Sequence, residues 1–402
     1  MASSTSAPCA VAGIRLAATA SGARYQGRDD LVLIEIADGA RTACVYTTNR
    51  FCAAPVTICR RHEQVAQPRY LIINAGNANA GTGDAGERAA LEVCAAVAEC
   101  GGCSIEQVLP FSTGVIGEQL DSKVLIDSLP ALFESLQQDN WSSAANGILT
   151  TDTRAKMRTA EVELDGQTVH VAGIVKGSGM IRPNMATMLA YVATDAPFEL
   201  TDLQNIARKV AERSFNCITV DGDTSTNDAF ALISTGNSGE SLSPSSGSAY
   251  DDVVSAIETV CIELAKDIVR DGEGATKFVT VRVQGGASES DCRNVAFIVA
   301  QSPLVKTALF ASDPNWGRIL AAAGRTPDTD FSIDDIDISI GGHAIIAGGQ
   351  PSPTYEESIA AKLMSEHDIE IEISIGAGST TAEVWTCDFS YDYVRINAEY
   401  RS

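Results

Sequence analysis

The chain has 402 residues, of which 45% are hydrophobic and 20% are charged, a balance typical of a folded protein with more than one core. Its formal net charge of −23 argues against nucleic acid and anionic membranes as general partners, because both attract positive surfaces. No basic residue precedes Arg15 and no apolar run reaches the roughly 18 residues of a membrane span, so we expect a cytoplasmic protein without a secretory signal.

The first part of the chain predicts strands that alternate with helices. We predict strands at residues 30–39, 41–49, 69–76 and 107–118. A polar glycine loop at the start of residues 77–102 leads into a helical pattern, and residues 125–136 predict a helix broken by Pro130.

The second part continues in the same manner. Residues 160–181 predict a hairpin that turns at Asp165–Gly166, and residues 200–215 predict an amphipathic helix with Thr201 as its N-cap. We predict a strand and polar turn at 217–228, a linker at 236–252, a long helix at 251–272, and mixed strands and helices to the end. Strands and helices in both halves predict a mixed class in which helices pack on sheets.

The cysteines and histidines limit the kinds of catalytic and metal sites that we expect in this chain. The 11 cysteines predict reduced, mostly buried thiols, and the pair Cys100–Cys103 closes a helical pattern instead of opening one, as a redox pair would. No second cysteine pair is spaced for zinc. The chain has four histidines: His62, His170, His343 and His367. None of them lies in a glycine-rich or polar cluster, which argues against a Ser-His-Asp triad and against a histidine metal site. We expect no metal and no cofactor.

Two nucleotide- or metal-like strings have simpler interpretations. Residues 81–86 match GxGxxG, but polar residues separate Gly81 from the preceding strand, and no acidic residue ends the next strand to hold a ribose. Residues 221–228 resemble the start of a calcium loop, but Thr226 replaces the glycine at the sixth position and Leu232 the glutamate at the twelfth. A loop before a helix and a hydrogen-bonded turn are the simpler interpretations.

Two further stretches carry candidate chemistry. Thr113 and Gly114 end a strand, where a hydroxyl and a backbone N–H can point at one oxyanion, although from this segment alone a tight turn is the simpler interpretation. A glycine- and proline-containing approach leads through Ala186 to Thr187 and an apolar run. A threonine whose own α-amino group is free can act as a nucleophile, because that amine has a pKa of roughly 7.7–8.0 and accepts the hydroxyl proton.

An internal threonine must first be freed by a cut before it. Thr187 Oγ can make that cut by attacking the carbonyl of Ala186, and water then hydrolyses the resulting ester. A strained approach and a small residue at the cleaved carbonyl favour this reaction, and residues 177–186 supply both. From these residues alone, a threonine that opens a buried strand remains the simpler interpretation.

Several segments together resemble one family over nearly the whole chain. They read, in order, NAGNANAGTG, STGVIGE, TTDT, KGSGMIRPNMATML, TVDGDTSTND, VRDGEGATKF, SDPNWGRILAAAGR and YDYVRINAEYRS. They resemble the arginine-biosynthesis ornithine acetyltransferase family, also called glutamate N-acetyltransferases (the ArgJ family). The resemblance implies an α+β fold: a self-processing αββα sandwich of the amidase type with an additional C-terminal α+β part.

The resemblance also implies a cut between Ala186 and Thr187. It would leave an α chain of residues 1–186 and a β chain of residues 187–402, assembled as an α2β2 heterotetramer. Residues 187–280 would complete the catalytic sandwich, and residues 281–402 would form the C-terminal part. The implied reaction transfers acetyl from N-acetylornithine to glutamate through acetyl-Thr187. Whether acetyl-CoA is a second donor stays open.

The functional residues of the family can be assigned to positions in this chain by matching the motifs. Thr187 is the implied nucleophile, and Thr113 and Gly114 are the implied oxyanion donors. The implied substrate contacts are Thr153, Lys176, Thr187, Glu273, Asn397 and Ser402, the last in place of a threonine that family members often carry. Because the chain is strongly acidic, the pocket must be locally positive, with Lys176 as the main contributor and Arg182 and Arg318 as further candidates.

Two alternatives remain. A self-processing aminopeptidase or amidohydrolase of the same fold would transfer the acyl group to water, and glutamate would then not raise turnover. A metabolite-binding protein without enzymatic activity would keep an uncut chain.

Overall fold

A computed structural model describes residues 10–164, 166–182, 188–238, 241–327, 329 and 331–399. The chain divides into two compact units, and each is described by itself. Unit one comprises Met1–Gly177, Arg182–Asn216 and Thr224–Ile268, and unit two comprises Ser178–Ile181, Cys217–Asp223 and Val269–Ser402.

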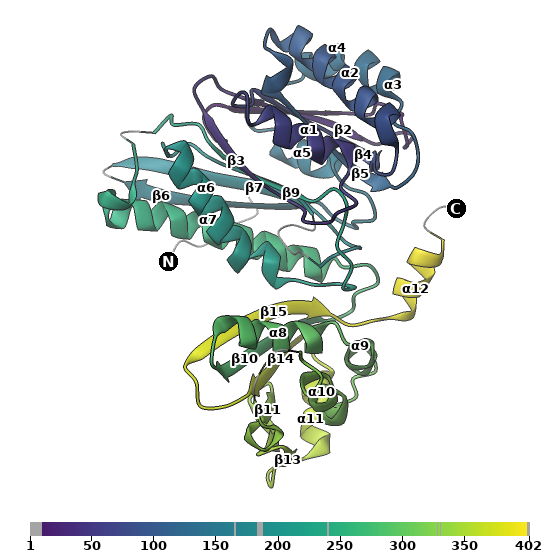
Figure 1. The fold of residues 1–402 in the computed structure, drawn as a ribbon, viewed down its shortest axis with the longest axis vertical. Helices are drawn as coiled ribbons and strands as arrows, with labels where there is room; N and C mark the ends of the chain where they lie inside the picture. The colour runs from purple at the N-terminus through teal and green to yellow at the C-terminus, as the bar shows by residue number, and fades with distance from the viewer. Residues whose placement is uncertain are drawn as a thin grey trace. The chain divides into compact units, whose positions relative to one another are not determined.

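Unit one contains two β-sheets (Figure 1). The four-stranded sheet has the order β1 (Ile14–Thr19), β2 (Leu31–Ile36), β4 (Tyr70–Asn77), β5 (Val108–Val115). The five-stranded sheet has the order β3 (Arg41–Tyr46), β9 (Ala229–Ser234), β8 (Leu189–Thr194), β7 (Gln167–Lys176), β6 (Lys156–Leu164). Strands β4 and β5 run parallel, as do β8 and β9, and the other neighbours are antiparallel.

The two sheets face each other across one apolar core. Strands of both sheets contribute fully buried side chains to it, among them Leu71 and Phe111 from one sheet and Ile174 and Tyr191 from the other. The rings of Phe111 and Tyr191 meet edge to face with centroids 5.3 Å apart. Helix α5 (Trp141–Gly147) adds its buried side chains to the same core. Strands β8 and β9 are buried at every position because both of their faces are covered.

Helices cover the outer faces of the sandwich. Helices α2 (Gly83–Gly101), α3 (Ser122–Asp127) and α4 (Leu129–Glu134) share a second core with the four-stranded sheet, and α1 (Ala54–His62) packs against β5 and α2. On the five-stranded sheet, α6 (Leu200–Arg213) packs against β3 and β9, and α7 (Ser248–Arg270) brings Leu264 against Gly173 of β7. The layer order is therefore αββα, which confirms the predicted fold class.

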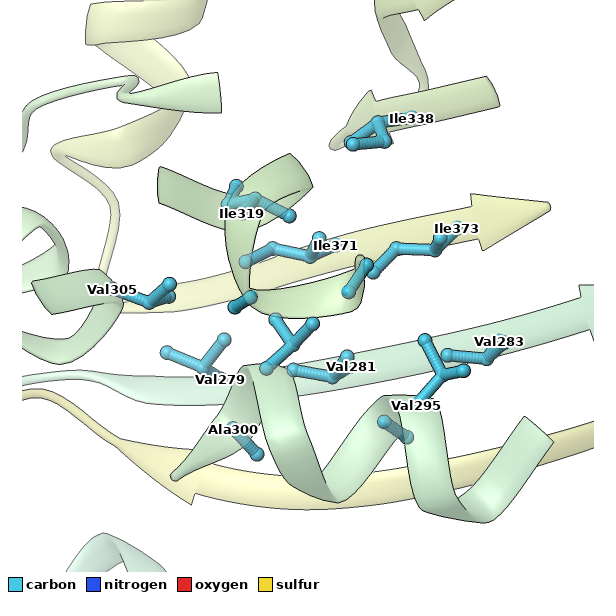
Figure 2. Packing of buried hydrophobic residues seen from close by; sticks show 14 of the residues in the cluster. Val279, Val281, Val283, Val295, Ala300, Val305, Ile319, Ile338, Ile371 and Ile373 are labelled. Carbon is cyan, nitrogen blue, oxygen red and sulfur yellow. The ribbon is translucent and has the colours of Figure 1, made fainter. Parts of the chain in front are cut away.

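Unit two is an α+β layer. Its sheet has the order β13 (Gln350–Pro351), β12 (His343–Ala347), β11 (Asp337–Ile340), β14 (Asp368–Ser374), β10 (Phe278–Gly286), β15 (Thr380–Cys387). Its helices are α8 (Glu289–Ala300), α9 (Pro303–Phe310), α10 (Trp316–Ala323), α11 (Glu357–Met364) and α12 (Tyr391–Ala398). Figure 2 shows alternate residues of β10, such as Val279, Val281 and Val283, packing together with Ile371 of β14 and Val295 of α8.

Two local predictions differ from the structure. Helix α6 begins at Leu200, because the Glu199 carbonyl accepts the first helical bond, from Leu203 N, so Thr201 lies inside the first turn and is not the N-cap. Residues 217–228 hold only single bridge residues, at Ile218 and Thr224, and the strand of this region, β9, begins at Ala229. The polar side chains before Ala229 hydrogen-bond to the backbone and to each other instead of pairing as a strand.

Short helical turns and helix ends complete the description of the fold. Single 3₁₀ turns occur at Ile105–Gln107, Phe215–Cys217, Pro244–Ser246 and Ile333–Asp335. Helix α2 ends with Gly102 in the left-handed conformation, so Cys100 lies in the last turn and Cys103 just beyond it, as predicted. Among the residues that the structure describes, no helix has both the length and the apolar composition that a membrane span requires.

Candidate functional site

Gly114 sits at an irregularity in the sandwich, where β5 pairs with β4. The register places Gly76 opposite Gly114 and then shifts at Asn77, which is a β-bulge. Gly114 has φ +133°, and a Cβ at this position would lie 2.2 Å from the carbonyl carbon of Gly76. Only glycine fits so close an approach. The close contact between the two backbones therefore fixes the direction of the Gly114 N–H.

Polar side chains hold this bulge in place. Ser112 Oγ donates to Asn74 Oδ1 at 2.5 Å, and Asn74 Nδ2 donates to the Asn77 carbonyl at 2.8 Å. From the turn that precedes β9 of the other sheet, Asn227 Nδ2 donates to the carbonyls of Ala78 at 2.6 Å and Ser112 at 2.9 Å. The segment on which Thr113 and Gly114 lie is thus fixed from both sheets by side chains that are themselves buried.

Lys176, at the end of β7, reaches Thr113 across the sandwich. Its Nζ donates to Thr113 Oγ1 at 3.2 Å and to Thr150 Oγ1 at 2.9 Å. A hydroxyl that accepts from an ammonium group must direct its own hydrogen elsewhere, because an ammonium group has no lone pair to receive it. The hydroxyl hydrogen of Thr113 is therefore directed away from Lys176 Nζ, and Gly114 follows Thr113 directly in the chain.

A buried carboxylate, Asp152, stands behind Lys176. Asp152 Oδ1 accepts from Lys156 Nζ at 2.6 Å and from Gly177 N at 2.7 Å, while Oδ2 accepts from Thr150 N at 3.1 Å and lies 4.0 Å from Lys176 Nζ. Burial alone would raise the pKa of Asp152, but the charges of Lys176 and Lys156 together with these hydrogen bonds hold that pKa well below its usual range. Asp152 is therefore a permanent anion between two cations.

Unit two contains a second buried carboxylate, Glu273, whose position is also constrained by its neighbours. Glu273 is 6% exposed, and its Oε2 accepts from Asn397 Nδ2 of α12 at 2.8 Å. A Cβ on Gly179 would lie 2.4 Å from Glu273 Cδ, so the chain passes directly over this carboxyl group. Ser178 completes the arrangement: its carbonyl accepts from Glu273 N at 3.0 Å and its Oγ donates to the Asp271 carbonyl at 2.6 Å.

The surroundings of Glu273 are acidic. Asp221 accepts from Met180 N at 2.6 Å and from Ile181 N at 2.9 Å, and burial raises its pKa despite these bonds. Burial and then the charges of Asp221 and Glu273 raise the pKa of the half-buried Tyr393 hydroxyl. Met180 itself has φ +55°, which is uncommon for a residue with a side chain. This part of unit two favours a cationic group.

The predicted site residues thus fall into two described sets. Unit one brings Thr113, Gly114 and Lys176 together, with Thr153 next to Asp152 in sequence. Unit two brings Glu273 and Asn397 into direct contact. Ala186, Thr187 and Ser402 lie outside the described residues.

The two arginine candidates for a positive pocket lie in different units of the chain. Burial lowers the pKa of Arg182, and Arg318 Nη1 donates to the Leu304 carbonyl at 2.9 Å on the surface of unit two. Sequence reasoning missed Asp152 and Lys156. Asp152 lies in the motif TTDT. Lys156 follows it by four residues and begins a strand, and a lysine at the start of a strand pattern was the only sign in the sequence that it could matter.

The two strings with nucleotide- and calcium-like spacing serve the fold. Asn79 Nδ2 donates to the Gly86 carbonyl at 2.8 Å, and a Cβ on Gly86 would lie 1.9 Å from Thr82 Oγ1, so this glycine allows the loop to pack on helix α2. Asp221 caps backbone N–H groups, as described above. In the part of the chain that the structure describes, no group of three His, Cys, Asp or Glu side chains is arranged to hold a metal ion.

Comparison with known proteins decides the family. The model of the ArgJ family matches residues 15–402. The chain belongs to the ArgJ family. Among its relatives, the "Arginine biosynthesis bifunctional protein ArgJ" of Psychrobacter arcticus is 52% identical over 393 residues, which are 98% of this chain and 97% of the relative. The protein of the same name from Methylococcus capsulatus is 50% identical over 394 residues, 98% and 96% of the two chains.

A solved structure of the ArgJ family supports the same conclusion. The arginine biosynthesis bifunctional protein ArgJ from Bacillus halodurans is 39% identical and superposes with a TM-score of 0.51, covering 53% of this chain and 100% of its own. The family resemblance inferred from the motifs is therefore confirmed.

Proposed function

We propose that this chain is a glutamate N-acetyltransferase of arginine biosynthesis, which transfers the acetyl group of N2-acetylornithine to glutamate. The observation that carries the proposal is the contact of Lys176 with Thr113 beside the constrained Gly114, in a chain of the ArgJ family. That contact combines a site for a carboxylate, which both amino-acid substrates carry, with two donors for an oxyanion.

The nucleophile is made by a cut in the chain. Thr187 Oγ attacks the Ala186 carbonyl, the peptide bond becomes an ester, and water releases the ester and leaves a free α-amine on Thr187. That amine has an unperturbed pKa of roughly 7.7–8.0, so it is partly neutral near pH 7 and accepts the proton of its own hydroxyl. Residues 1–186 then form an α chain and residues 187–402 a β chain.

Acetyl transfer follows in two half-reactions. Thr187 Oγ attacks the acetyl carbonyl of N2-acetylornithine, the oxyanion accepts from the Thr113 hydroxyl and the Gly114 N–H, and ornithine leaves with the proton that the amine held. The α-amine of glutamate then attacks the acetyl ester, the Thr187 amine takes the proton, and N-acetylglutamate leaves. This is a ping-pong reaction with acetyl-Thr187 as the intermediate.

Substrate recognition follows the charges of the two sets. Lys176 holds the α-carboxylate of either substrate, and Thr153, which follows Asp152 in sequence, is a further substrate contact. Glu273 holds the side-chain ammonium group of ornithine, and its hydrogen bond from Asn397 fixes the direction in which Oε1 points. Ser402 contributes a further hydroxyl to the substrate contacts.

Assembly and the second donor complete the proposal. The solved Bacillus halodurans chain matches 53% of this chain over its full length, about 213 of 402 residues, which is close to the 216 residues of the β chain (402 minus 186). This length supports two separate chains. Within the β chain, residues 188–216 and 224–268 belong to unit one, and residues 217–223 and 269–402 belong to unit two. We infer an α2β2 heterotetramer in the cytoplasm. The relatives are named bifunctional, and we expect acetyl-CoA to be the second donor to glutamate.

One experiment tests the nucleophile and a second tests the acceptor. A denaturing gel with N-terminal sequencing should show two chains, the second beginning Thr-Met-Leu, and a single intact chain in active protein would refute the mechanism. Turnover of N2-acetylornithine should then rise with added glutamate and yield N-acetylglutamate. Turnover that glutamate does not change, with acetate as product, would instead identify a hydrolase of the same fold.

A further inference from the structure

The segment 20–30, which connects β1 to β2, packs against the glycine pair of the candidate oxyanion site. A Cβ on Gly76 would lie 2.5 Å from Arg24 Cβ and 3.1 Å from Tyr25 Cε2. Gly76 is the residue opposite Gly114 in the register of β4 and β5. The segment therefore lies directly against the backbone contact that fixes the direction of the Gly114 N–H.

The base of this segment is held in place by a buried carboxylate. Asp30 is 1% exposed, and its Oδ1 accepts from Ser21 N at 2.6 Å, which joins the two ends of the segment. The Asp30 carbonyl accepts from Ala75 N of β4 at 2.8 Å. These bonds tie the segment to the strand that pairs with β5, so its side chains project from a fixed base.

Arg28 connects the same segment to the lysine of the site. Its Nη2 donates to the Leu149 carbonyl. Leu149 directly precedes Thr150, whose hydroxyl accepts from Lys176 Nζ at 2.9 Å. The Arg28 guanidinium group is thus bonded one residue along the chain from a partner of Lys176. Unit one therefore places a second cation close to the first.

The ring of Tyr25 fixes the plane of this guanidinium group. Arg28 is partly buried, and its Cζ lies 3.9 Å from the centroid of the Tyr25 ring. Stacking on an aromatic face restricts the rotation of a guanidinium group, which carries five N–H donors, more than one carbonyl can accept. The planar arrangement of these donors matches the two oxygens of a carboxylate. Arg28 is therefore preorganised to bind a carboxylate.

The two amino-acid substrates make opposite demands on the site. Both carry an α-carboxylate, but the side chain of ornithine ends in a cation and that of glutamate ends in an anion. Glu273 suits the first side chain and repels the second, because like charges repel strongly where water is excluded. A glutamate molecule whose α-carboxylate is bound by Lys176 therefore needs another cation for its side chain.

We propose that Arg28 binds the side-chain carboxylate of glutamate and thereby selects the acetyl acceptor. The inference rests on the proposed function, because it takes glutamate to be the acceptor. Arg28 precedes every motif that carried the family resemblance, so the motifs gave no indication of it. The choice of acceptor, and not the use of the donor, should depend on this residue.

Kinetics of the whole enzyme with two acceptors test the inference. Glutamine has nearly the same shape as glutamate but lacks the side-chain charge. Arg28→Met should lower kcat/KM for glutamate about ten- to hundredfold, the range expected for lost hydrogen bonds to a charged group, and change kcat/KM for glutamine little. In a ping-pong reaction kcat/KM for N2-acetylornithine reports the first half-reaction alone, and it should stay close to that of the parent.

Two further variants complete the design. Arg28→Lys keeps the charge but loses the planar set of donors, so its preference for glutamate over glutamine should be weaker than that of the parent. This variant preserves the test if Arg28→Met does not fold. Arg41 provides a matched control, because its Nη1 also donates to a backbone carbonyl, that of Gly39 at 2.8 Å, at the start of β3. Arg41→Met should keep the preference of the parent.

The outcomes separate this inference from the proposed function. An unchanged preference for glutamate over glutamine in the Arg28 variants would overturn the inference, because a purely structural loss lowers both rates alike. If the parent makes no N-acetylglutamate, the proposed function fails, and calorimetric affinities for glutamate and glutamine replace the rates. A preference that the parent shows and Arg28→Met loses would then support the role of Arg28 alone. A parent that shows no preference in binding would overturn it.

Discussion

Substitution of Gly114 by alanine should disable the oxyanion site, because no side chain fits at this position. The added Cβ would lie 2.2 Å from the carbonyl carbon of Gly76, 2.4 Å from its oxygen and 2.6 Å from Asn77 N. All three are backbone atoms, so no rotamer change relieves the contact, and the β4–β5 bulge must open. The N–H of residue 114 then moves away from the oxyanion position.

The expected magnitude follows from two separate effects of Gly114→Ala. Loss of one oxyanion donor costs about 2.7–4 kcal/mol of transition-state stabilisation, which lowers kcat by roughly 10²–10³-fold. The left-handed backbone and the forced contact destabilise the fold by about 1–3 kcal/mol. Because the self-cleavage of the chain passes through an oxyanion of the same kind, uncut precursor should accumulate as well.

Gly117 provides a matched control three residues away, just beyond the end of β5. It also has a positive φ, +85°, but a Cβ there would meet nothing within 4 Å. Gly117→Ala should therefore cost only the backbone strain of about 1–2 kcal/mol and leave kcat near that of the parent. The assay compares thermal unfolding midpoints, the fraction of cut chain on a denaturing gel, and kcat at saturating substrates. Equal kcat values for the two alanine variants would refute the assignment of Gly114.

Three more changes have defined outcomes. Thr187→Ala should block both the cut and acetyl transfer, since one oxygen serves both, whereas Thr187→Ser should keep part of each; a Thr187→Ala chain that still splits at this bond on a gel would contradict the mechanism. Asn397→Ala removes the donor to Glu273, and the loss of a hydrogen bond to a charged group, about 1.5–3 kcal/mol, should raise KM for N2-acetylornithine by about ten- to hundredfold while KM for acetyl-CoA stays constant. The pKa of Asp152 is held below its usual value near 3.9, so its ionised form stabilises the fold above about pH 4, and this contribution falls as the pH drops below that value. Urea midpoints of the parent and of Asp152→Asn should therefore differ more at pH 7 than at pH 3, and an equal difference would show that the carboxylate is not stabilised by its neighbours.

The sequence predicted the elements whose apolar pattern is strong and missed those whose pattern is weak. Residues 69–76 and 107–118 were predicted as strands, and β4 and β5 occupy them. Strand β1 (Ile14–Thr19) was not predicted because its small residues carry little propensity, and β9 was hidden behind the polar run that precedes Ala229. The αββα layer order came from the family resemblance, since periodicity shows that a strand is buried and not what covers it.

The candidate site shows the same limit at the level of single residues. We predicted Thr113, Gly114 and Lys176 because they lie in motifs typical of the family. The structure brings Lys176 of one sheet into contact with Thr113 of the other, next to Gly114. Asp152 lies in one of those motifs as well, but its role depends on its distance from Lys156 and Lys176, and a sequence contains no distances. The assignment of Thr187 as nucleophile remains a prediction, because it lies outside the described residues.

A protein with a net charge of −23 repels the anion glutamate at long range, so its binding site needs positive charge close to the ligand. Surface carboxylates more than a Debye length away, about 8 Å at physiological ionic strength, are screened by salt, whereas charges inside the protein are screened much less. Lys156 and Lys176 lie inside, so the positive charge of Lys176 acts at short range and in a low dielectric. Raising the salt concentration should therefore weaken glutamate binding little, whereas a site that depended on solvent-exposed cations would lose affinity steadily with salt.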